Sequence, residues 1–320
     1  MKKNKIKDTG LEVTELSFGT SSLGSMPDTY GYEVPEDRAQ KTLNRFFQGP
    51  VNMLDTSRNY AMGESEKRIG KAIKENGGWP KGFLLSTKLD RNMDTLVLDK
   101  NRARESLEES LKTLNVDSVD ILFLHDPEYA KDITDITKKD GAMDELFKIK
   151  NEGLAKAVGV AMGKVDIMFP LLRDWDFDVV INHNRYTLIN REANEMYDYA
   201  SSKNIAIFNA APYAGGVLAK GPDNFKKVTY QDATEEQLAP AREYEKVCKK
   251  HNVELGAAAL QFSLRDSRIT STICGVTSIE SIEKNLAWAN AEISGEFWEE
   301  ISKLPFSTND PESERVFTPG

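Results

Sequence analysis

Four side chains in the first half of the sequence could together move a proton: Asp55, Tyr60, Lys88 and His125. A tyrosine alone, with a pKa of about 10, is a poor acid or base near neutrality. A lysine ammonium close to the phenol would stabilise the phenolate and lower that pKa. An aspartate would keep the ammonium charged, and a histidine would hydrogen-bond and orient the reacting oxygen. This combination favours proton transfer at a carbonyl or hydroxyl group.

The spacing of these residues places them at the ends of apolar runs. Asp55 follows the run 51–54, Lys88 follows 83–87, and His125 follows 119–124, while Tyr60 lies five positions after Asp55. One such residue alone is more often a solvated rim residue or a helix cap. Three of them at the ends of consecutive strands would meet at one mouth of a parallel barrel, and this joint placement carries the interpretation.

The surrounding sequence alternates between short apolar runs and amphipathic segments. Eight strand–helix pairs in series predict a (β/α)₈ barrel. A doubly wound sheet is the alternative, but no GxGxxG follows any expected strand. The turn 8–10 between residues 5–7 and 11–13 predicts an N-terminal β-hairpin. The expected strands are 16–19, 51–54, 83–87, 119–124, 157–160, 179–182, 206–208 and 273–274.

The helical segments show apolar positions at helical spacing. Residues 100–114 are the clearest case, with Ala103, Leu107, Leu111 and Leu114 on one face. Two connections, 127–141 and 213–237, are long and suggest binding loops at the rim. The tail 306–320 could lie over the same rim or be disordered. The other expected helices begin at Pro35 or cover 65–73, 143–151, 192–203, 238–250, 256–265 and 278–291.

Composition narrows the class of protein. The chain has 320 residues, 39% of them hydrophobic, and a net charge of −9, so it can bury a large core but suits neither nucleic acid nor an anionic membrane. Two cysteines, Cys248 and Cys274, allow no disulfide framework and suit a reducing compartment. No signal or membrane span is evident. We expect one cytoplasmic domain over residues 1–320, monomeric or weakly oligomeric.

Several segments resemble the aldo-keto reductase family. LEVTELSFGTSSLG resembles its opening strand, LDTSRNYAMGESEKRIGKAI its Asp-x-x-x-x-Tyr motif, STK and LFLHDPE its lysine and histidine segments, and GLAKAVGVAMG its fifth strand. The segments NRYTLIN, APYAGGVLAKG and AAALQFSLRDSRITSTICGVTSIESIEKN are similar to its sugar 1-dehydrogenase branch, which acts on D-threo-aldoses, L-fucose and L-galactose. The resemblance covers nearly the whole chain.

The resemblance implies a role for each of the four residues. Tyr60 would be the general acid/base, Lys88 would tune it, Asp55 would pair with Lys88, and His125 would orient the substrate. Since the sequence has no metal-ligand cluster, we expect no metal, and a nicotinamide nucleotide would supply the redox half of the reaction. Sugar recognition would involve Tyr60, His125, Asp126, Arg185 and Tyr213, with Glu128 and Tyr186 as weaker candidates.

The cofactor would lie on the loops after the seventh and eighth strands, the second of which runs into a helix N-terminus that can meet pyrophosphate. Where relatives place cations for an adenosine 2′-phosphate, this chain has Gly275, Thr277 and Ser281, so NAD is favoured over NADP. Ala210, Ala161 and Met162 replace the family's nicotinamide clamp, leaving His183 as a candidate. The expected cofactor residues are Gly19, Thr20, Asp55, His183, Pro212, Gly216, Val217, Leu218, Gly275, Val276, Thr277, Ser281 and Asn285.

Together these features predict an NAD-dependent oxidation of the anomeric carbon of an aldose to a lactone. L-fucose, D-arabinose and L-galactose are the candidate sugars. An NADPH-dependent aldehyde or ketone reductase of the same family is one alternative. A non-catalytic, nucleotide-sensing barrel is the other, although a sensor need not keep all four residues.

Overall fold

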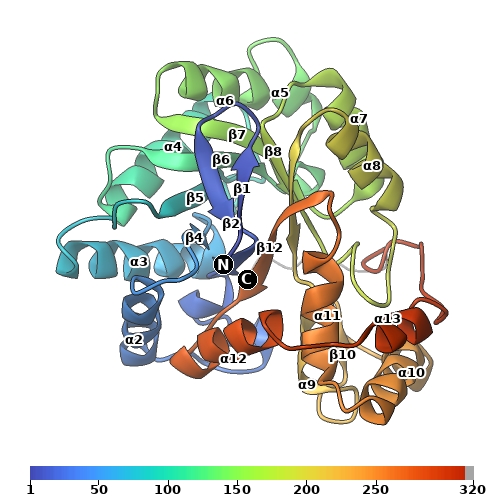
Figure 1. Cartoon of the computed structure of the whole chain (residues 1–320). Coiled ribbons are helices and arrows are strands. Elements are labelled where there is room, and N and C mark those ends of the chain that lie inside the picture. The colour runs from blue at the N-terminus through green and yellow to red at the C-terminus, as the bar shows by residue number, and fades with distance from the viewer. Residues whose placement is uncertain (314–320) are drawn as a thin grey trace.

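The computed structural model describes residues 1–313 and shows a closed barrel of eight parallel strands (Figure 1). The last strand pairs with the first, since Ile273 lies opposite Ser17 and Gly275 opposite Gly19. The predicted (β/α)₈ class is confirmed. The barrel strands, in the order in which they pair around the barrel, are β3 (Leu16–Gly19), β4 (Met53–Asp55), β5 (Leu84–Leu89), β6 (Val119–His125), β7 (Ala155–Met162), β8 (Val179–His183), β9 (Ala206–Ala210) and β12 (Ile269–Gly275).

The predicted N-terminal hairpin is also present, as β1 (Lys3–Ile6) and β2 (Leu11–Thr14). Its apolar side chains Ile6 and Val13 are fully buried and share one cluster with Met53, Phe123 and Phe208 from the barrel interior. Because β2 leads directly into β3, the hairpin covers the end where the strands begin. The polar side chains at the other ends of the strands are left to line a site.

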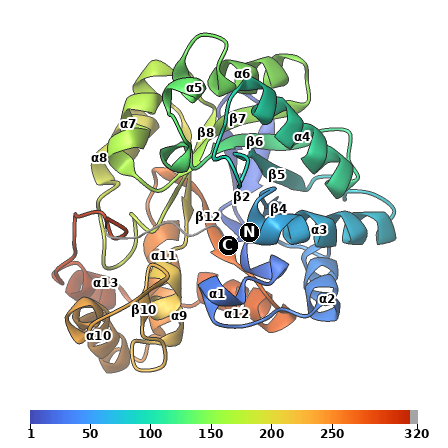
Figure 2. The same cartoon turned by 180° about the vertical axis from the view of Figure 1, so that it is seen from behind.

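A layer of helices surrounds the barrel (Figure 2). Helix α4 follows the predicted apolar stripe: Ala103, Leu107 and Leu114 are fully buried, and Asp99 caps its first turn by accepting from the N–H of Arg102. The eight helices that follow the barrel strands are α2 (Glu36–Phe46), α3 (Glu64–Glu75), α4 (Lys100–Leu114), α6 (Ala142–Asn151), α7 (Val165–Asp174), α8 (Asn194–Ser202), α11 (Leu255–Leu264) and α12 (Ile279–Ala289).

Apart from three helices of four residues each in the connections, two helices were not predicted from the sequence. Helix α7 contains Pro170, which weakens its helical signal, and α13 (Gly295–Ile301) is short. Helix α13 lies beside α10 (Glu235–Lys250), and the two share a second apolar cluster that includes Phe297 and Val247 (Figure 1). In residues 1–313, no helix is both long enough and apolar enough to cross a bilayer.

The long connections contain short elements rather than unstructured loops. The first connection holds η3 (Pro127–Tyr129) and α5 (Thr134–Thr137), and the second holds η4 (Ala214–Gly216), α9 (Val217–Lys220), β10 (Lys227–Val228) and β11 (Gln231–Asp232). Near the cavity described below, β3 leads into η1 (Ser22–Gly24) and α1 (Pro27–Tyr30), and β4 leads into η2 (Tyr60–Gly63).

The C-terminal segment is held against the rim as far as residue 313, and residues 314–320 of the predicted tail lie outside the described part. Arg185, fully buried, donates to Glu312 and, over 2.5 Å, to Asp310. The expectation that Arg185 binds substrate is therefore wrong, because its buried guanidinium is paired with the carboxylates of the C-terminal segment. Thr229 also donates to the carbonyl of Pro311 at 3.0 Å.

Gly159 allows β7 and β8 to approach closely. A Cβ on Gly159 would lie 1.6 Å from the carbonyl oxygen of Val179. Gly159→Ala should therefore force the two strands apart and lower the free energy of unfolding by about 2 kcal/mol or more. The control is Gly295→Ala, where an added Cβ meets no atom within 4 Å. Chemical denaturation gives the free energy of unfolding of each variant. Equal values for the two variants would contradict the close packing at Gly159.

Arg185→Met should destabilise the protein strongly. Removing the guanidinium leaves the buried Glu312 carboxylate without its cation, a loss of about 3–5 kcal/mol for a buried pair. The matched control is Arg242→Met, since Arg242 also pairs with two carboxylates, Asp223 and Glu235, but at the surface, where ion pairs contribute little to stability. Thermal melting gives the melting temperature of each variant. Similar melting temperatures for the two would show that the buried pairing of Arg185 does not stabilise the fold.

Candidate active site

A cavity of about 510 Å³ lies at the C-terminal ends of the barrel strands, a size typical of small-molecule sites. Asp55, Tyr60, Lys88 and His125 line one part of its wall, and Lys284, Asn285 and Trp288 of α12 line another. The structure thus brings the four predicted residues together, in the same cavity as one face of α12.

Lys88 is the centre of the polar cluster. Its side chain is 2% exposed, and its ammonium donates to Asp55 Oδ2 at 2.8 Å, to the carbonyl of Thr56 at 2.6 Å and to Tyr60 Oη at 3.0 Å. Asp55 Oδ1 accepts from Ser86 Oγ at 2.7 Å. An ammonium has three N–H donors, so the three partners satisfy Lys88 completely and fix the phenol beside it.

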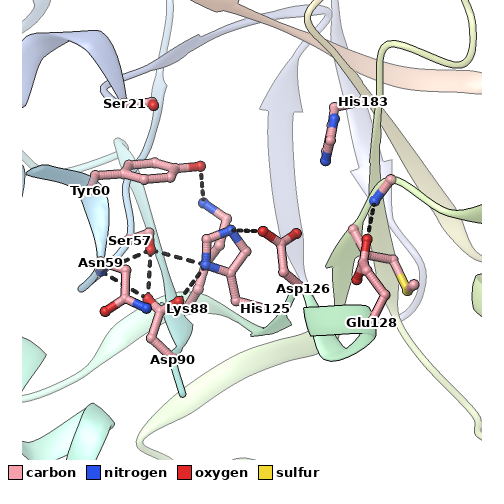
Figure 3. A network of polar contacts seen from close by, with 12 residues as sticks. Ser21, Ser57, Asn59, Tyr60, Lys88, Asp90, His125, Asp126, Glu128 and His183 are labelled. Atoms are coloured by element: carbon pink, nitrogen blue, oxygen red, sulfur yellow. Dashed lines mark hydrogen bonds and ion pairs between the residues drawn. The ribbon is translucent and has the colours of Figure 1, made fainter. Parts of the chain in front are cut away.

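His125 is held by partners that were not predicted. Its Nδ1 lies 2.5 Å from Asp90 Oδ1 and 3.1 Å from Ser57 Oγ, and Ser57 donates to Asp90 Oδ2 at 2.6 Å (Figure 3). The rings of His125 and Tyr60 lie edge to face with centroids 5.7 Å apart. The sequence did carry a signal for Asp90: Ser86, Lys88 and Asp90 alternate along β5, which points their side chains the same way.

The pKa of Tyr60 is shifted in the direction opposite to the sequence-based expectation. Burial raises the pKa of the phenol well above its ordinary value, and the nearby charge of Asp55 raises it further. The expectation of a lowered pKa was wrong, because the Lys88 ammonium is already neutralised by Asp55 and does not outweigh burial and the Asp55 charge. Tyr60 is therefore a protonated phenol at neutral pH.

The wall near α12 contains part of the predicted cofactor set. Gly19, Asp55, His183, Gly216, Gly275, Thr277, Ser281 and Asn285 line the cavity. Five other members of the set are buried and do not line the cavity, so their contact with the cofactor stays a prediction: Thr20, Pro212, Val217, Leu218 and Val276.

Ser281 has a structural task as well. Its hydroxyl accepts from the N–H groups of Thr277 and Ser278, each at 3.0 Å, and its own N–H donates to Ser278 Oγ, which closes a capping box at the start of α12. This arrangement fixes the loop and the helix dipole that faces the cavity. The ammonium of Lys284, not singled out from the sequence, lies 4.6 Å over the Trp288 ring and 3.9 Å from Glu254.

The proposed sugar-binding residues separate in space. Asp126 lines the cavity beside His125, with its Oδ2 3.7 Å from His125 Nε2. Tyr213 also lines the cavity but lies on the α12 side, where its hydroxyl donates to Asn285 Oδ1 at 2.5 Å. Its contact with a sugar stays a prediction. Glu128 accepts from the N–H of Gly163 at 3.0 Å, and burial raises its pKa to about 7.

The other weak candidate, Tyr186, is buried and donates to Asp266, and it does not line the cavity. Additional cavity residues near the four were missed by sequence reasoning, namely Tyr30, Asn59, Arg91, Met93 and Tyr230. They sit on rim loops whose fold could not be read from periodicity. Within residues 1–313, no three His, Cys, Asp or Glu side chains are grouped so as to hold a metal ion.

Comparisons with known proteins identify the family of the chain. A model of the aldo/keto reductase family matches residues 15–305. The chain is 30% identical over 284 residues to an L-galactose dehydrogenase of Arabidopsis thaliana (88% of this chain, 85% of the relative). It is 27% identical over 321 residues to a D-threo-aldose 1-dehydrogenase of a Pseudomonas species (92% and 94%).

Among solved structures, the fold resembles an aldo-keto reductase from Bacillus halodurans in its holo form. The TM-score is 0.79 with 22% identity, covering 99% of this chain and all of the other. At this identity the likeness speaks for the fold alone. Since the family model spans most of the sequence, the chain belongs to the aldo/keto reductase family of oxidoreductases.

Proposed function

We propose that the protein oxidises the anomeric carbon of an aldose to the sugar lactone, with transfer of a hydride to NAD. The observation that carries this proposal is the contact of Tyr60 Oη with the buried Lys88–Asp55 pair, beside His125, in a cavity that continues to the start of α12. L-fucose, D-arabinose and L-galactose are the candidate sugars, and the two sugar dehydrogenases among its relatives support this substrate class.

The cavity wall suits a dinucleotide. Glycines at positions 19, 216 and 275 leave the wall open for close approach, and the capped start of α12 directs its dipole toward a pyrophosphate. Asn285 and Trp288 would hold the adenine end, and His183 would face the carboxamide. When bound, the nicotinamide accepts the hydride from the sugar carbon.

The four residues would divide the remaining chemistry among them. The anomeric hydroxyl would lie between Tyr60 and His125 and lose its proton to Tyr60 as the hydride leaves. Lys88, 3.0 Å from the phenol oxygen, would stabilise the phenolate that must form first. Asp126 would bind a sugar hydroxyl, because its Oδ1 is buried without a hydrogen-bond partner among the described residues.

A second candidate is reduction of an aldehyde or ketone with NADPH. Burial keeps Tyr60 protonated, and a phenol that holds its proton suits a general acid in reduction. The same site can catalyse both directions, so the cofactor and the carbonyl substrate would distinguish the two proposals. A non-catalytic nucleotide sensor would bind nucleotide but turn over neither sugars nor aldehydes.

Tyr60→Phe should lower kcat about 10³-fold or more while leaving NADH binding unchanged. In the parent, oxidation should speed up as pH rises, because the required phenolate forms only above the ordinary tyrosine range; this alkaline rise should vanish in the variant. The control is Tyr129→Phe, on the same rim but outside the cavity wall. A panel of aldoses with NAD and NADP gives the readout, and near-parental oxidation by Tyr60→Phe would refute the assignment.

The cofactor preference should follow the charge near Thr277. The parent should bind NADH more tightly than NADPH, since Gly275, Thr277 and Ser281 are uncharged. The ammonium of Lys284, which also lines the cavity, lies against Glu254 and the Trp288 ring. Thr277→Lys should shift the ratio of the two dissociation constants about ten-fold toward NADPH, the equivalent of one charge-assisted phosphate contact. The control is Ser302→Lys at the end of α13. Fluorescence titration measures the ratio; a parent that prefers NADPH would favour the reductase.

A further inference from the structure

The carboxylate of Asp90 is completely buried at the end of β5 and faces His125 (Figure 3). Its two oxygens have different partners. Oδ1 lies 2.5 Å from His125 Nδ1. Oδ2 accepts from Ser57 Oγ at 2.6 Å and from the N–H of Asn59 at 3.1 Å. The carboxylate is thereby held on one side by the loop that carries Tyr60 and on the other side by the imidazole.

The backbone of Asp90 is fixed as well. Its N–H donates to Ser106 Oγ at 2.9 Å, and its carbonyl accepts from Arg102 Nε at 3.1 Å. Both partners lie on α4, the helix with the clearest apolar stripe. Because the N–H, the carbonyl and Oδ2 of Asp90 are all hydrogen-bonded, its carboxylate cannot shift. The orientation of the His125 ring is therefore set by its hydrogen bond to Oδ1 of Asp90.

We propose that Asp90 is a positioning residue for His125: it takes the Nδ1 proton in a hydrogen bond, directs Nε2 at the reacting oxygen, and stabilises the imidazolium. This inference rests on the proposed function, in which His125 orients the reacting oxygen, and it names Asp90 as the residue that sets the orientation of the His125 ring. With Nδ1–H committed to Asp90, the neutral ring presents a lone pair at Nε2 and the charged ring presents an N–H there.

The charged ring matters because oxidation leaves negative charge on the anomeric oxygen as its proton departs. An Nε2–H donor beside that oxygen would stabilise the developing charge. Asp126 Oδ2 lies 3.7 Å from Nε2, too far for a hydrogen bond, which leaves the Nε2 donor available to a substrate. In reduction the same donor would polarise a carbonyl.

The groups around the ring have opposing effects on its charge. Burial lowers the pKa of His125, but the charge of Asp90 and then that of Asp126 outweigh burial, so the pKa lies above its ordinary value. The charge of Lys88, which lies in β5 two residues before Asp90, opposes them, and the Tyr60 ring contacts the imidazole edge to face. Because Asp90 is the only one of these groups within hydrogen-bonding distance of a ring nitrogen, its removal should have the largest effect on the ring.

The first test observes the ring without any substrate. The chain has three histidines, so ring-labelled protein gives three resolvable signals, with His125 assigned by His125→Gln. In the parent, ¹⁵N shifts should show neutral His125 as the Nδ1–H tautomer. In Asp90→Asn, the titration midpoint of His125 should fall by about one to three pH units. An Nε2–H tautomer in the parent, or an unmoved midpoint in the variant, would overturn the proposal.

The second test asks whether Asp90 acts through His125. Asp90→Asn should lower kcat about ten-fold or more with little change in NADH binding. Because the charged ring is the active form, the fall in activity that accompanies loss of the His125 proton should move to lower pH. In a His125→Gln background the same change should lower kcat little further, as a double-mutant cycle requires of coupled residues. Equal losses in both backgrounds would mean that Asp90 serves only the fold.

The two tests also separate this inference from the proposed function. If no aldose is oxidised but the NMR results are as expected, the substrate assignment fails and Asp90 still positions His125. If sugar oxidation is observed but the tautomer is Nε2–H, the function stands and the inference about Asp90 falls. Because the tautomer is measured on the parent protein, the result does not depend on whether Asp90→Asn folds.

Discussion

The site depends on a buried ammonium. Lys88 is almost inaccessible to water, and burying an isolated ammonium would cost far more than a folded domain can supply. Its three acceptors come from β4, from the residue after β4, and from η2, so all three must be in place before the charge can be buried. The requirement to satisfy Lys88 therefore fixes the position of Tyr60 relative to Asp55, and with it one side of the cavity.

The barrel also contains a second buried cation, and the comparison shows what makes Lys88 a candidate for chemistry. Arg185 is as deeply buried and pairs with Asp310 and Glu312. Its guanidinium faces a tail segment rather than the cavity, so it joins chain segments and cannot reach a ligand. Lys88 shares its charge with a phenol that lines the cavity. Burial and pairing are common to both residues; access to a cavity is what separates them.

Sequence patterns predicted the barrel and the convergence at its mouth because both follow from local rules. Runs of apolar residues end in polar ones, and the carboxyl ends of parallel strands meet at one mouth of the barrel, where Asp55, Lys88 and His125 line one cavity. The pairing of Arg185 could not be predicted from such local patterns, because its partner Glu312 lies 127 positions further along the chain. Helix α7 was missed because Pro170 masks its pattern, whereas Asp90 was readable from strand alternation.

The charges of the site set the conditions under which it can act. Asp55, Asp90 and Asp126 lie around one ammonium and one imidazole. Burial and the charges of these carboxylates keep Tyr60 protonated, and the charges of Asp90 and Asp126 favour the charged form of His125. The free site is thus prepared to donate protons, which suits a carbonyl, whereas oxidation of a hydroxyl first requires Tyr60 to lose its proton. An oxidised nicotinamide carries a positive charge and a reduced one does not, so a bound cofactor would shift this balance in opposite ways for the two directions. The preferred direction of the reaction would then depend on which form of the cofactor is bound. The charge of the cofactor would change how readily Tyr60 loses its proton, while the barrel fixes where the Tyr60 phenol lies.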